Sequence, residues 1–367
     1  MTIFNVKVKE TTLSKEGKNL GAVDVITTNI FTYYGADNFA PFVLNTIPDQ
    51  HIAVMNTLEV DISDVFDDAD IDRGDIITIT AVSADRLLGA SVVDNKLRLY
   101  GHSVGQTTVT VTATDLLGKS VSDTLTVSVF AIIWVGGMAS GSAMLFEVDS
   151  ATGDVLSQFN ASDIPTVGDL RTIASVEYDR SDGTLWFNDN QNPTGGGFGD
   201  GQVLYHTELD GTLISKRSTE TQGIVSPDGI ALDRDGSLWL ISNANNRVYN
   251  TNKEGTVLYS SFSFGTGISG LALDASDNLW VTDASTDRIY NITKAGATLS
   301  SFPNSQFDAS SGNVLGIGYS RWTDSLWIQD ILTAKIYNID LQGNLISSFN
   351  DSLLASPLNP SALSAVS

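Results

Sequence analysis

Tryptophan residues recur at matching positions through the second half of this chain. Five of them stand in short apolar frames, with spacings of 52, 53, 41 and 47 residues: Trp134, Trp186, Trp239, Trp280 and Trp327. Periods of this size are typical of propeller blades or solenoid repeats. The repeat therefore constrains the fold more than any single residue does.

Each repeat contains four segments that read as strands. In one unit a short apolar run, Gly229–Asp233, is followed by a polar turn, Asp235–Ser237, and then by the strand that carries Trp239. An aromatic strand, Arg247–Asn250, and a last strand, Thr256–Phe262, complete the unit. Polar turns between β runs are hairpin signals, and four strands are the number in a propeller blade. Complete units of this kind start near Ile173, Asp228, Ser269 and Leu315.

The two ends of the repeat region complete each other. The unit around Trp134 lacks an inner strand ahead of it, and residues 360–366 match an inner strand with no unit after it. Joining them closes the ring and removes open sheet edges. The sequence therefore predicts a five-bladed β-propeller over residues 131–367, closed by the C-terminal strand, with the tryptophans packed between blades.

The repeats resemble those of NHL-type and gluconolactonase-like propellers, over most of residues 170–350. The segments Pro227–Trp239 and Gly270–Asp274 carry the resemblance. In gluconolactonase-like enzymes, an Asp in the Pro-Asp-Gly context helps to hold a divalent metal over the channel, and Asp228 matches that position. The corresponding places in the other inner strands hold no acid, which disfavours this activity: Ser175, Ser269, Gly316 and Ser361.

Composition narrows the classes of partner. The chain has 43 acidic and 20 basic residues, a net charge of −23 and a pI near 4.2. These values argue against nucleic acid and against an anionic membrane surface, because both need a basic face. There is no cysteine, no apolar run of membrane-spanning length and no signal-peptide core at the N-terminus. The three histidines, His51, His102 and His206, are too scattered to form a catalytic triad.

Residues 41–130 alternate like the strands of an immunoglobulin-like sandwich. This block resembles a bacterial cadherin-like (dystroglycan-type) domain. The resemblance is carried by Ile47–Gln50, by the acidic turn Phe66–Asp72 and by Thr112–Asp115. In that family such acids can bind Ca²⁺ between modules, although the acidic linker of true cadherins is missing here and only one such module is present.

The acidic turn itself suggests a metal site. Four carboxylates within six residues repel one another unless a cation or solvent screens them, and hard oxygen ligands suit Ca²⁺. The predicted ligands come from this turn and from one residue that the strands could bring near it: Asp67, Asp68, Asp70, Asp72 and Asp115. The alternative is a solvated acidic loop, since the full EF-hand pattern is absent.

Residues 1–40 form a third part. Four of the ten lysines fall in the first 18 residues, and Ile3–Lys9 and Val23–Tyr34 read as strands. So short a segment cannot build a strong core of its own. It is either an ordinary first strand pair of the sandwich or an arm that docks on another subunit.

The expected architecture is all-β: an N-terminal β arm, an immunoglobulin-like sandwich and the propeller. An extracellular composition without a secretion signal favours a non-enzymatic bacteriophage virion protein, such as a fibre, appendage or decoration protein. Its N-terminal region would contact other virion proteins in a multicopy or homo-oligomeric assembly. Blade loops 190–201 and 303–313 would bind a host-surface glycan or protein. The alternatives are a bacterial surface or type I-secreted adhesin, located extracellularly or on the cell surface, and a gluconolactonase-like enzyme.

Overall fold

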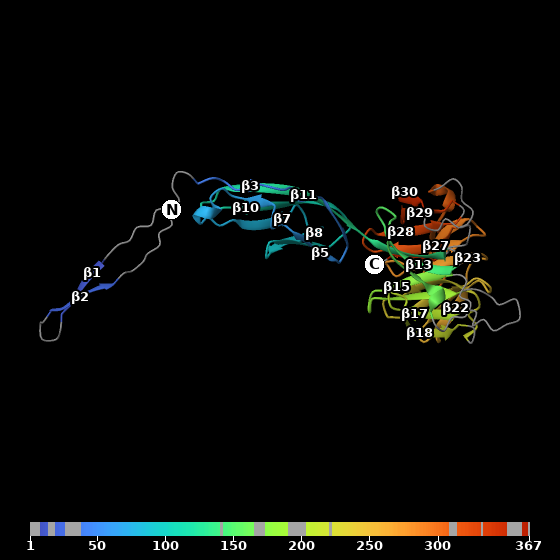
Figure 1. The fold of residues 1–367 in the computed structure, drawn as a ribbon. Helices are drawn as coiled ribbons and strands as arrows, with labels where there is room; N and C mark the ends of the chain where they lie inside the picture. Colours follow the sequence, from blue (N-terminus) through green and yellow to red (C-terminus); the bar gives the residue numbers. More distant parts are fainter. Residues whose placement is uncertain are drawn as a thin grey trace. The chain divides into compact units, whose positions relative to one another are not determined.

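The structure is a computed structural model, and it describes residues 8–13, 19–25, 38–139, 142–164, 173–189, 203–219, 222–307, 314–331, 333–350 and 362–365. Strands dominate these residues, and short 3-10 turns interrupt them at Ile71–Arg73, Ala161–Asp163 and Asn304–Gln306. The chain divides into two compact units, Met1–Val129 and Phe130–Ser367 (Figure 1). Within the described ranges, no helix has the length and apolar character needed to cross a membrane.

The first unit contains a four-stranded sheet and a three-stranded sheet with alternating burial. Val109 and Val111 of one strand lie opposite Leu125 and Asp123 of its neighbour, and the valines and Leu125 are buried. This alternation places one face of the sheet in an apolar core. The four-stranded sheet has the order β4 (Gln50–Ala53), β11 (Ser120–Phe130), β10 (Gly105–Thr114) and β7 (Thr78–Ser83). The three-stranded sheet has the order β5 (Thr57–Asp61), β9 (Lys96–Gly101) and β8 (Leu88–Val93), and a short pair joins β3 (Phe42–Val43) to β6 (Phe66–Asp67).

The N-terminal strands differ from their predicted bounds. β1 (Val8–Leu13) pairs antiparallel with β2 (Asn19–Val25) in a separate two-stranded sheet. The sequence pattern predicts strands at 3–9 and 23–34, parts of which lie outside the described residues. Residue alternation fixes a strand only where one face is buried, and a two-stranded ribbon lacks that constraint.

Among the described residues of the second unit there are five four-stranded antiparallel sheets, each a propeller blade. Four blades follow the chain from the innermost strand to the outermost. Blade 2 has β15 (Ser175–Asp179), β16 (Thr184–Asp189), β17 (Val203–Thr207) and β18 (Leu213–Ser218); blade 3 has β19 (Pro227–Leu232), β20 (Leu238–Ser242), β21 (Arg247–Thr251) and β22 (Val257–Ser263). Blade 4 has β23 (Ile268–Leu273), β24 (Leu279–Asp283), β25 (Arg288–Ile292) and β26 (Thr298–Pro303); blade 5 has β27 (Val314–Ser320), β28 (Ser325–Asp330), β29 (Lys335–Asp340) and β30 (Leu345–Asn350).

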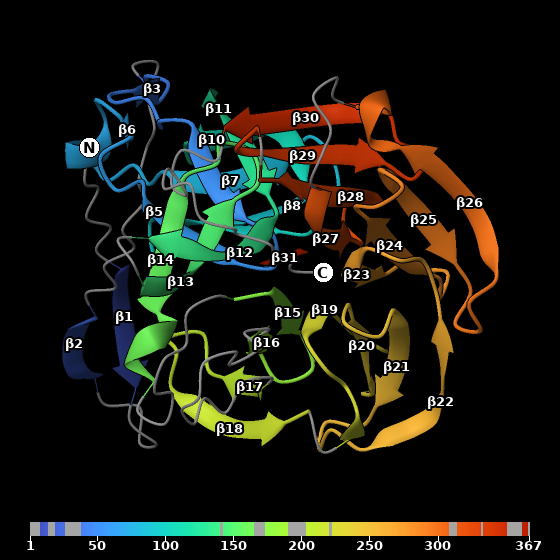
Figure 2. The ribbon, with the colours of Figure 1, turned by 90° about the vertical axis from the view of Figure 1, so that its right-hand side faces the viewer.

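Blade 1 joins the two ends of the propeller sequence. Its outer strands are β12 (Ile132–Ala139), β13 (Ser142–Asp149) and β14 (Val155–Asn160), and its inner strand is the C-terminal β31 (Ala362–Ala365). Trp134 of β12 lies opposite Ser364 of β31 in the antiparallel register. Figure 2 shows the five inner strands gathered around the centre of the ring. The predicted all-β fold and its closure by the C-terminal strand are confirmed.

Apolar clusters fill the seams between blades. In the seam of blades 3 and 4, for example, Trp239 and Val248 pack with Leu271 and Val281. The five repeat tryptophans are all at most 6% exposed, so they are interblade core as predicted. Three of them donate from indole Nε1 to the acid that ends the preceding inner strand: Trp186 to Asp179 at 3.3 Å, Trp239 to Asp233 at 2.8 Å and Trp280 to Asp274 at 2.9 Å.

A repeated aromatic–glycine contact also joins neighbouring blades. Near the end of an outermost strand, a Phe ring lies against a Gly in the last turn of the next blade, as Phe302 does against Gly343. A Cβ on Gly343 would stand 2.7 Å from this ring, so only glycine fits. Blade 2 departs from the pattern because Arg217 occupies the Phe position and donates from Nε to the Lys253 carbonyl at 2.9 Å.

Glu177 of β15 ties three inner strands together. Its carboxylate accepts from the Leu232 backbone N–H of β19 at 3.2 Å and from Ser364 Oγ of β31 at 3.0 Å. Ser364 Oγ in turn accepts from the Tyr178 backbone N–H at 3.2 Å. Although part of the Glu177 side chain remains accessible, its carboxyl group is enclosed, and this burial raises the pKa of Glu177 to about 8 against the opposing hydrogen bonds.

Deleting residues 362–367 should strongly destabilise the second unit. The deletion exposes an edge of β12 and removes Leu363, which is 2% exposed in the apolar cluster between blades 1 and 5. We expect aggregation or a large fall in the melting temperature, measured by calorimetry. An unchanged transition in the truncated protein would mean that the ring closes elsewhere.

Replacing Glu177 by Gln should stabilise the protein increasingly as the pH rises from about 4.5 to about 8. The folded pKa of Glu177 lies above its unfolded value, so its contribution to stability is complete below about pH 4.5 and is lost as the pH rises through about 8. We expect Glu177→Gln to match the wild type near pH 4.5 and to exceed it near pH 9 by several kcal/mol, up to about 5 kcal/mol. Urea unfolding at both pH values measures this, and a difference that does not change with pH would contradict it.

Candidate functional site

The predicted acidic turn forms a compact group of buried carboxylates in the first unit. Asp68, Asp70 and Asp75 each offer an oxygen atom, and these three atoms lie within 4.8 Å of one another. The residues are only 4–5% exposed. Within the described residues, this is the one group of three or more Asp, Glu, His or Cys side chains spaced to hold a metal ion.

Local turn geometry brings these acids together. β6 ends at Asp67, the 3-10 turn Ile71–Arg73 follows, and Gly74 then reverses the chain with a φ of 95°. Glycine adopts this left-handed conformation at little cost. The Asp75 backbone N–H donates to the Asp70 carbonyl at 3.2 Å, which closes the loop and places Asp75 beside the two earlier acids.

Hydrogen bonds satisfy one side of the group and leave the other side open. Asp68 Oδ1 accepts from the Asp70 backbone N–H at 2.8 Å, and Asp75 Oδ1 accepts from the backbone N–H groups of Ile76 and Leu116 at 2.7 and 3.2 Å. The second oxygens, Asp68 Oδ2 and Asp75 Oδ2, are buried without a hydrogen-bond partner. A buried carboxylate oxygen without a partner is costly, and a cation between the two would remove that cost.

The group and the nearby Asp115 also form hydrogen bonds with residues 38–39. The Phe39 backbone N–H donates to Asp70 Oδ2 at 2.6 Å, and Asn38 Nδ2 donates to Asp115 Oδ2 at 2.9 Å. Lys119 Nζ donates to the Asn38 carbonyl. The chain that follows residues 1–37 is therefore held at the acidic group.

The five predicted ligands have different environments. Asp68 and Asp70 belong to the group. Asp115 is outside the group, and the adjacent residues Asn38 and Phe39 connect the two, since Asn38 binds Asp115 and Phe39 binds Asp70. Asp115 accepts from the Leu117 and Lys119 backbone N–H groups at 2.8 Å each. Burial opposes the ionisation of Asp115, but these bonds and Asn38 lower its pKa below the usual value. Asp67 accepts from the Asp68 backbone N–H at 2.8 Å, and Asp72 is exposed in the 3-10 turn.

Asp75 is the member that the sequence analysis did not name. It begins the segment leading to β7, so its carboxylate looked like part of a strand. Gly74 is the sequence feature that could have indicated it. A glycine within an acidic segment favours a chain reversal, and a reversal can place the next acid beside the preceding ones. Three carboxylates supply hard oxygen ligands of the kind that Ca²⁺ prefers.

Asp228 is not part of such a group among the described residues. It lies buried on β19, and the strand registers place Ala174 next to β15, Ser269 of β23 and Leu315 of β27 at the corresponding positions. The predicted counterparts Ser175 and Gly316 correspond to Gly229 instead. Ser361 and the predicted loop 190–201 lie outside the described residues. Of the second predicted loop, residues 303–307 are described and form the end of β26 and a 3-10 turn.

Comparisons with known proteins concern the fold alone. No protein-family model matches this sequence, and no curated protein matches it. Similar solved structures include a streptogramin B lyase, at 18% identity over 59% of this chain and 68% of that chain with a TM-score of 0.37. They also include a nidogen/laminin complex, at 14% identity over 79% and 99% with a TM-score of 0.42. A protein of unknown function from Bacteroides caccae shows 13% identity over 64% and 98%, with a TM-score of 0.43.

Calcium should stabilise the first unit through this group. A ligand that binds only the folded state adds about 2.7 kcal/mol at one hundred times its dissociation constant. We expect millimolar Ca²⁺ to raise the unfolding midpoint relative to chelator, and Asp75→Asn to abolish the rise. In chelator, Asp75→Asn should unfold at or above the wild-type midpoint, because it relieves carboxylate repulsion.

The exposed Asp72 provides the matched control for charge. Asp72→Asn removes the same charge from the same turn but should leave the Ca²⁺ response intact. If Ca²⁺ and chelator give one midpoint for the wild-type protein, the group is an acidic turn and not a metal centre.

Proposed function

We propose that this chain is a non-catalytic structural and attachment protein of the kind carried on bacteriophage particles as a fibre, appendage or decoration. The observation that carries the proposal is the group of Asp68, Asp70 and Asp75, whose carboxylate oxygens are spaced to hold a metal ion. Asp70 of this group binds the Phe39 backbone, and the neighbouring Asp115 binds Asn38, directly after residues 1–37. A site of this kind would stiffen the connection between a docking segment and the body that it presents.

The chemistry of the group supports a place outside the cell. A few carboxylates without the full EF-hand loop make a weak site, and extracellular modules bind Ca²⁺ in the range of about 0.1–1 mM. Such a site would be filled outside a cell, where the acidic surface of this chain also favours solubility. The resemblance of this unit to cadherin-like domains agrees with a mechanical role for Ca²⁺.

The propeller supports the attachment half of the proposal. Its ring is rigid because apolar clusters fill the seams and the C-terminal strand closes it. Surfaces built on a rigid scaffold are the usual place for recognition. We propose that the N-terminal region contacts other virion proteins, and that the propeller binds a glycan or protein of the host surface in many copies per particle.

Fractionation of the source cells tests the location. We expect mass spectrometry to find the chain in purified particles, and deletion of residues 1–40 to prevent incorporation without lowering the melting temperature of the propeller. Recovery in a cell-surface or particle-free secreted fraction alone would favour the adhesin alternative instead.

A separate assay tests the non-catalytic part of the proposal. Hydrolysis of a lactone by the purified chain, lost in Asp228→Ala, would overturn it. We expect no such activity, because the residues corresponding to Asp228 on the other described inner strands include no second carboxylate.

A further inference from the structure

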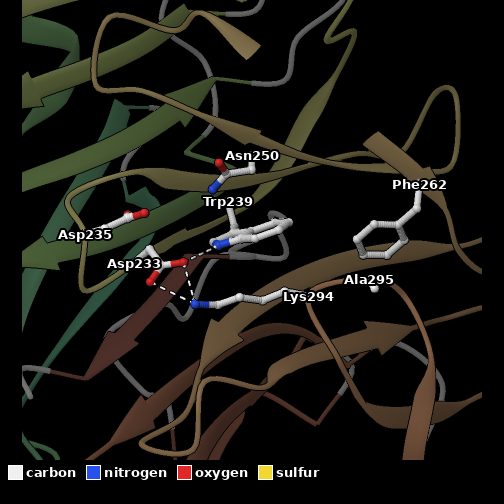
Figure 3. A pocket seen from close by; sticks show the side chains of 7 residues that line it. All are labelled: Asp233, Asp235, Trp239, Asn250, Phe262, Lys294 and Ala295. Atoms are coloured by element: carbon white, nitrogen blue, oxygen red, sulfur yellow. Dashed lines mark hydrogen bonds and ion pairs between the residues drawn. The ribbon is translucent and has the colours of Figure 1, made fainter. Parts of the chain in front are cut away.

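A pocket of about 400 Å³ opens at the seam between blades 3 and 4. Its size falls within the range of small-molecule sites. Figure 3 shows the side chains that line it. They come from β20, β21, β22 and the turns that follow β19 and β25. They are Asp233, Asp235, Trp239, Asn250, Phe262, Lys294 and Ala295.

Two aromatic side chains form the apolar surfaces of the pocket. Trp239 of β20 is 6% exposed, and its Nε1 donates to Asp233 Oδ2 at 2.8 Å, so the indole ring is fixed in place. Phe262 of β22 also borders the pocket, beside Ala295 (Figure 3). Flat apolar surfaces of this kind suit the C–H face of a ring-shaped ligand.

Three polar groups surround these rings. Asn250 is 2% exposed; its Nδ2 donates to Ser237 Oγ at 2.8 Å, while its Oδ1 is buried without a partner. The Lys294 ammonium group is held 2.7 Å from Asp233 Oδ2 (Figure 3). Asp235 is exposed at the rim, and a hydrogen bond from Ser237 lowers its pKa. The pocket thus offers a cation and an ionised acceptor at its mouth, while Asn250 Oδ1 is buried.

The unpartnered amide oxygen is not unique to this seam. Asn291 and Asn338 occupy the same place in blades 4 and 5 and also lack a partner at Oδ1, and water could satisfy all three. This seam differs from the next one in the turn between the last two strands of the second blade. In blade 4 this turn contains Lys294 and Ala295, and the corresponding turn of blade 5 contains Leu341 and Gln342.

The neighbouring seams show what fills the corresponding space. Between blades 4 and 5, Leu341 packs on the apolar cluster that contains Trp280. Between blades 2 and 3, His206 replaces the Asn and stacks on Trp186, with ring centroids 4.0 Å apart at 7°. The pocket therefore results from particular substitutions in the repeat and not from the propeller fold itself.

We propose that this seam binds one neutral hexopyranose unit of a glycan. The C–H face of the sugar packs on Phe262 and on the small exposed part of Trp239, and its hydroxyl groups donate to Asp235 and accept from Lys294. The inference rests on the proposed attachment function, for which it names the class of ligand. It places recognition in a seam, whereas the sequence analysis placed it in loops.

The indole N–H signal of Trp239 in ¹⁵N–¹H NMR spectra provides a direct readout. We expect it to shift as glucose, galactose or N-acetylglucosamine is added at millimolar concentration to the full chain. Lys294→Leu should weaken the response at least about tenfold. This variant should fold, because the next seam already combines Leu341 with the same Asp–Trp pair. Asp235→Asn, which keeps the acceptor for the Ser237 backbone N–H, should weaken binding without altering the melting temperature.

Lys253→Leu is the matched control. Lys253 forms the same pair with Asp179 in the preceding seam, so the variant loses an equivalent charge and ion pair but leaves the pocket untouched. Its response should equal that of the wild type. No shift of the Trp239 signal with any of the three sugars, or equal shifts in wild type and Lys294→Leu, would overturn the proposal. If the chain binds sugar but is absent from purified particles, the proposed virion function is contradicted while the proposed sugar site stands.

Discussion

The close approach of neighbouring inner strands is the constraint on which the second unit depends. A Cβ on Gly270 would stand 2.2 Å from the Leu315 carbonyl oxygen, and one on Gly229 would stand 2.5 Å from the Ser269 carbonyl oxygen. Neither distance can be relieved by turning a side chain, because the obstacle is backbone. A ring of five blades thus brings its inner strands together so closely that glycine is required at these positions.

Glu177 is a large ionisable side chain on the innermost strand β15, and it connects blades of the ring. Its place opposite Trp186 corresponds to Ala231 and Gly318 in other blades. Because its carboxylate bridges β19 and β31, it links the closing strand to two other blades. A buried carboxyl group with satisfied hydrogen bonds adds specificity of closure, at a cost that grows when the group ionises.

Much of this architecture was readable from the sequence because its signals are local and repeated. The Trp spacing, the polar turns such as Asp235–Ser237 and the unpaired final strand predicted the ring and its closure. The contacts between blades were not readable in this way. The pocket depends on Ala295 facing a blade some forty residues earlier, and the repeat pattern alone treats it as an ordinary turn residue. In the first unit, Asp75 joins Asp68 only because Gly74 reverses the chain.

The unfolding free energy of Gly270→Ala tests the central constraint most directly. Gly270 has an ordinary φ, so the variant adds only a methyl group where the Leu315 carbonyl stands. Gly236→Asp is the control, since Gly236 has open space around it and Asp277 adopts the same left-handed conformation in the next blade. We predict a loss of more than about 3 kcal/mol for Gly270→Ala and less than about 1 kcal/mol for Gly236→Asp. Two variants that both unfold like the wild type would contradict the account of the ring.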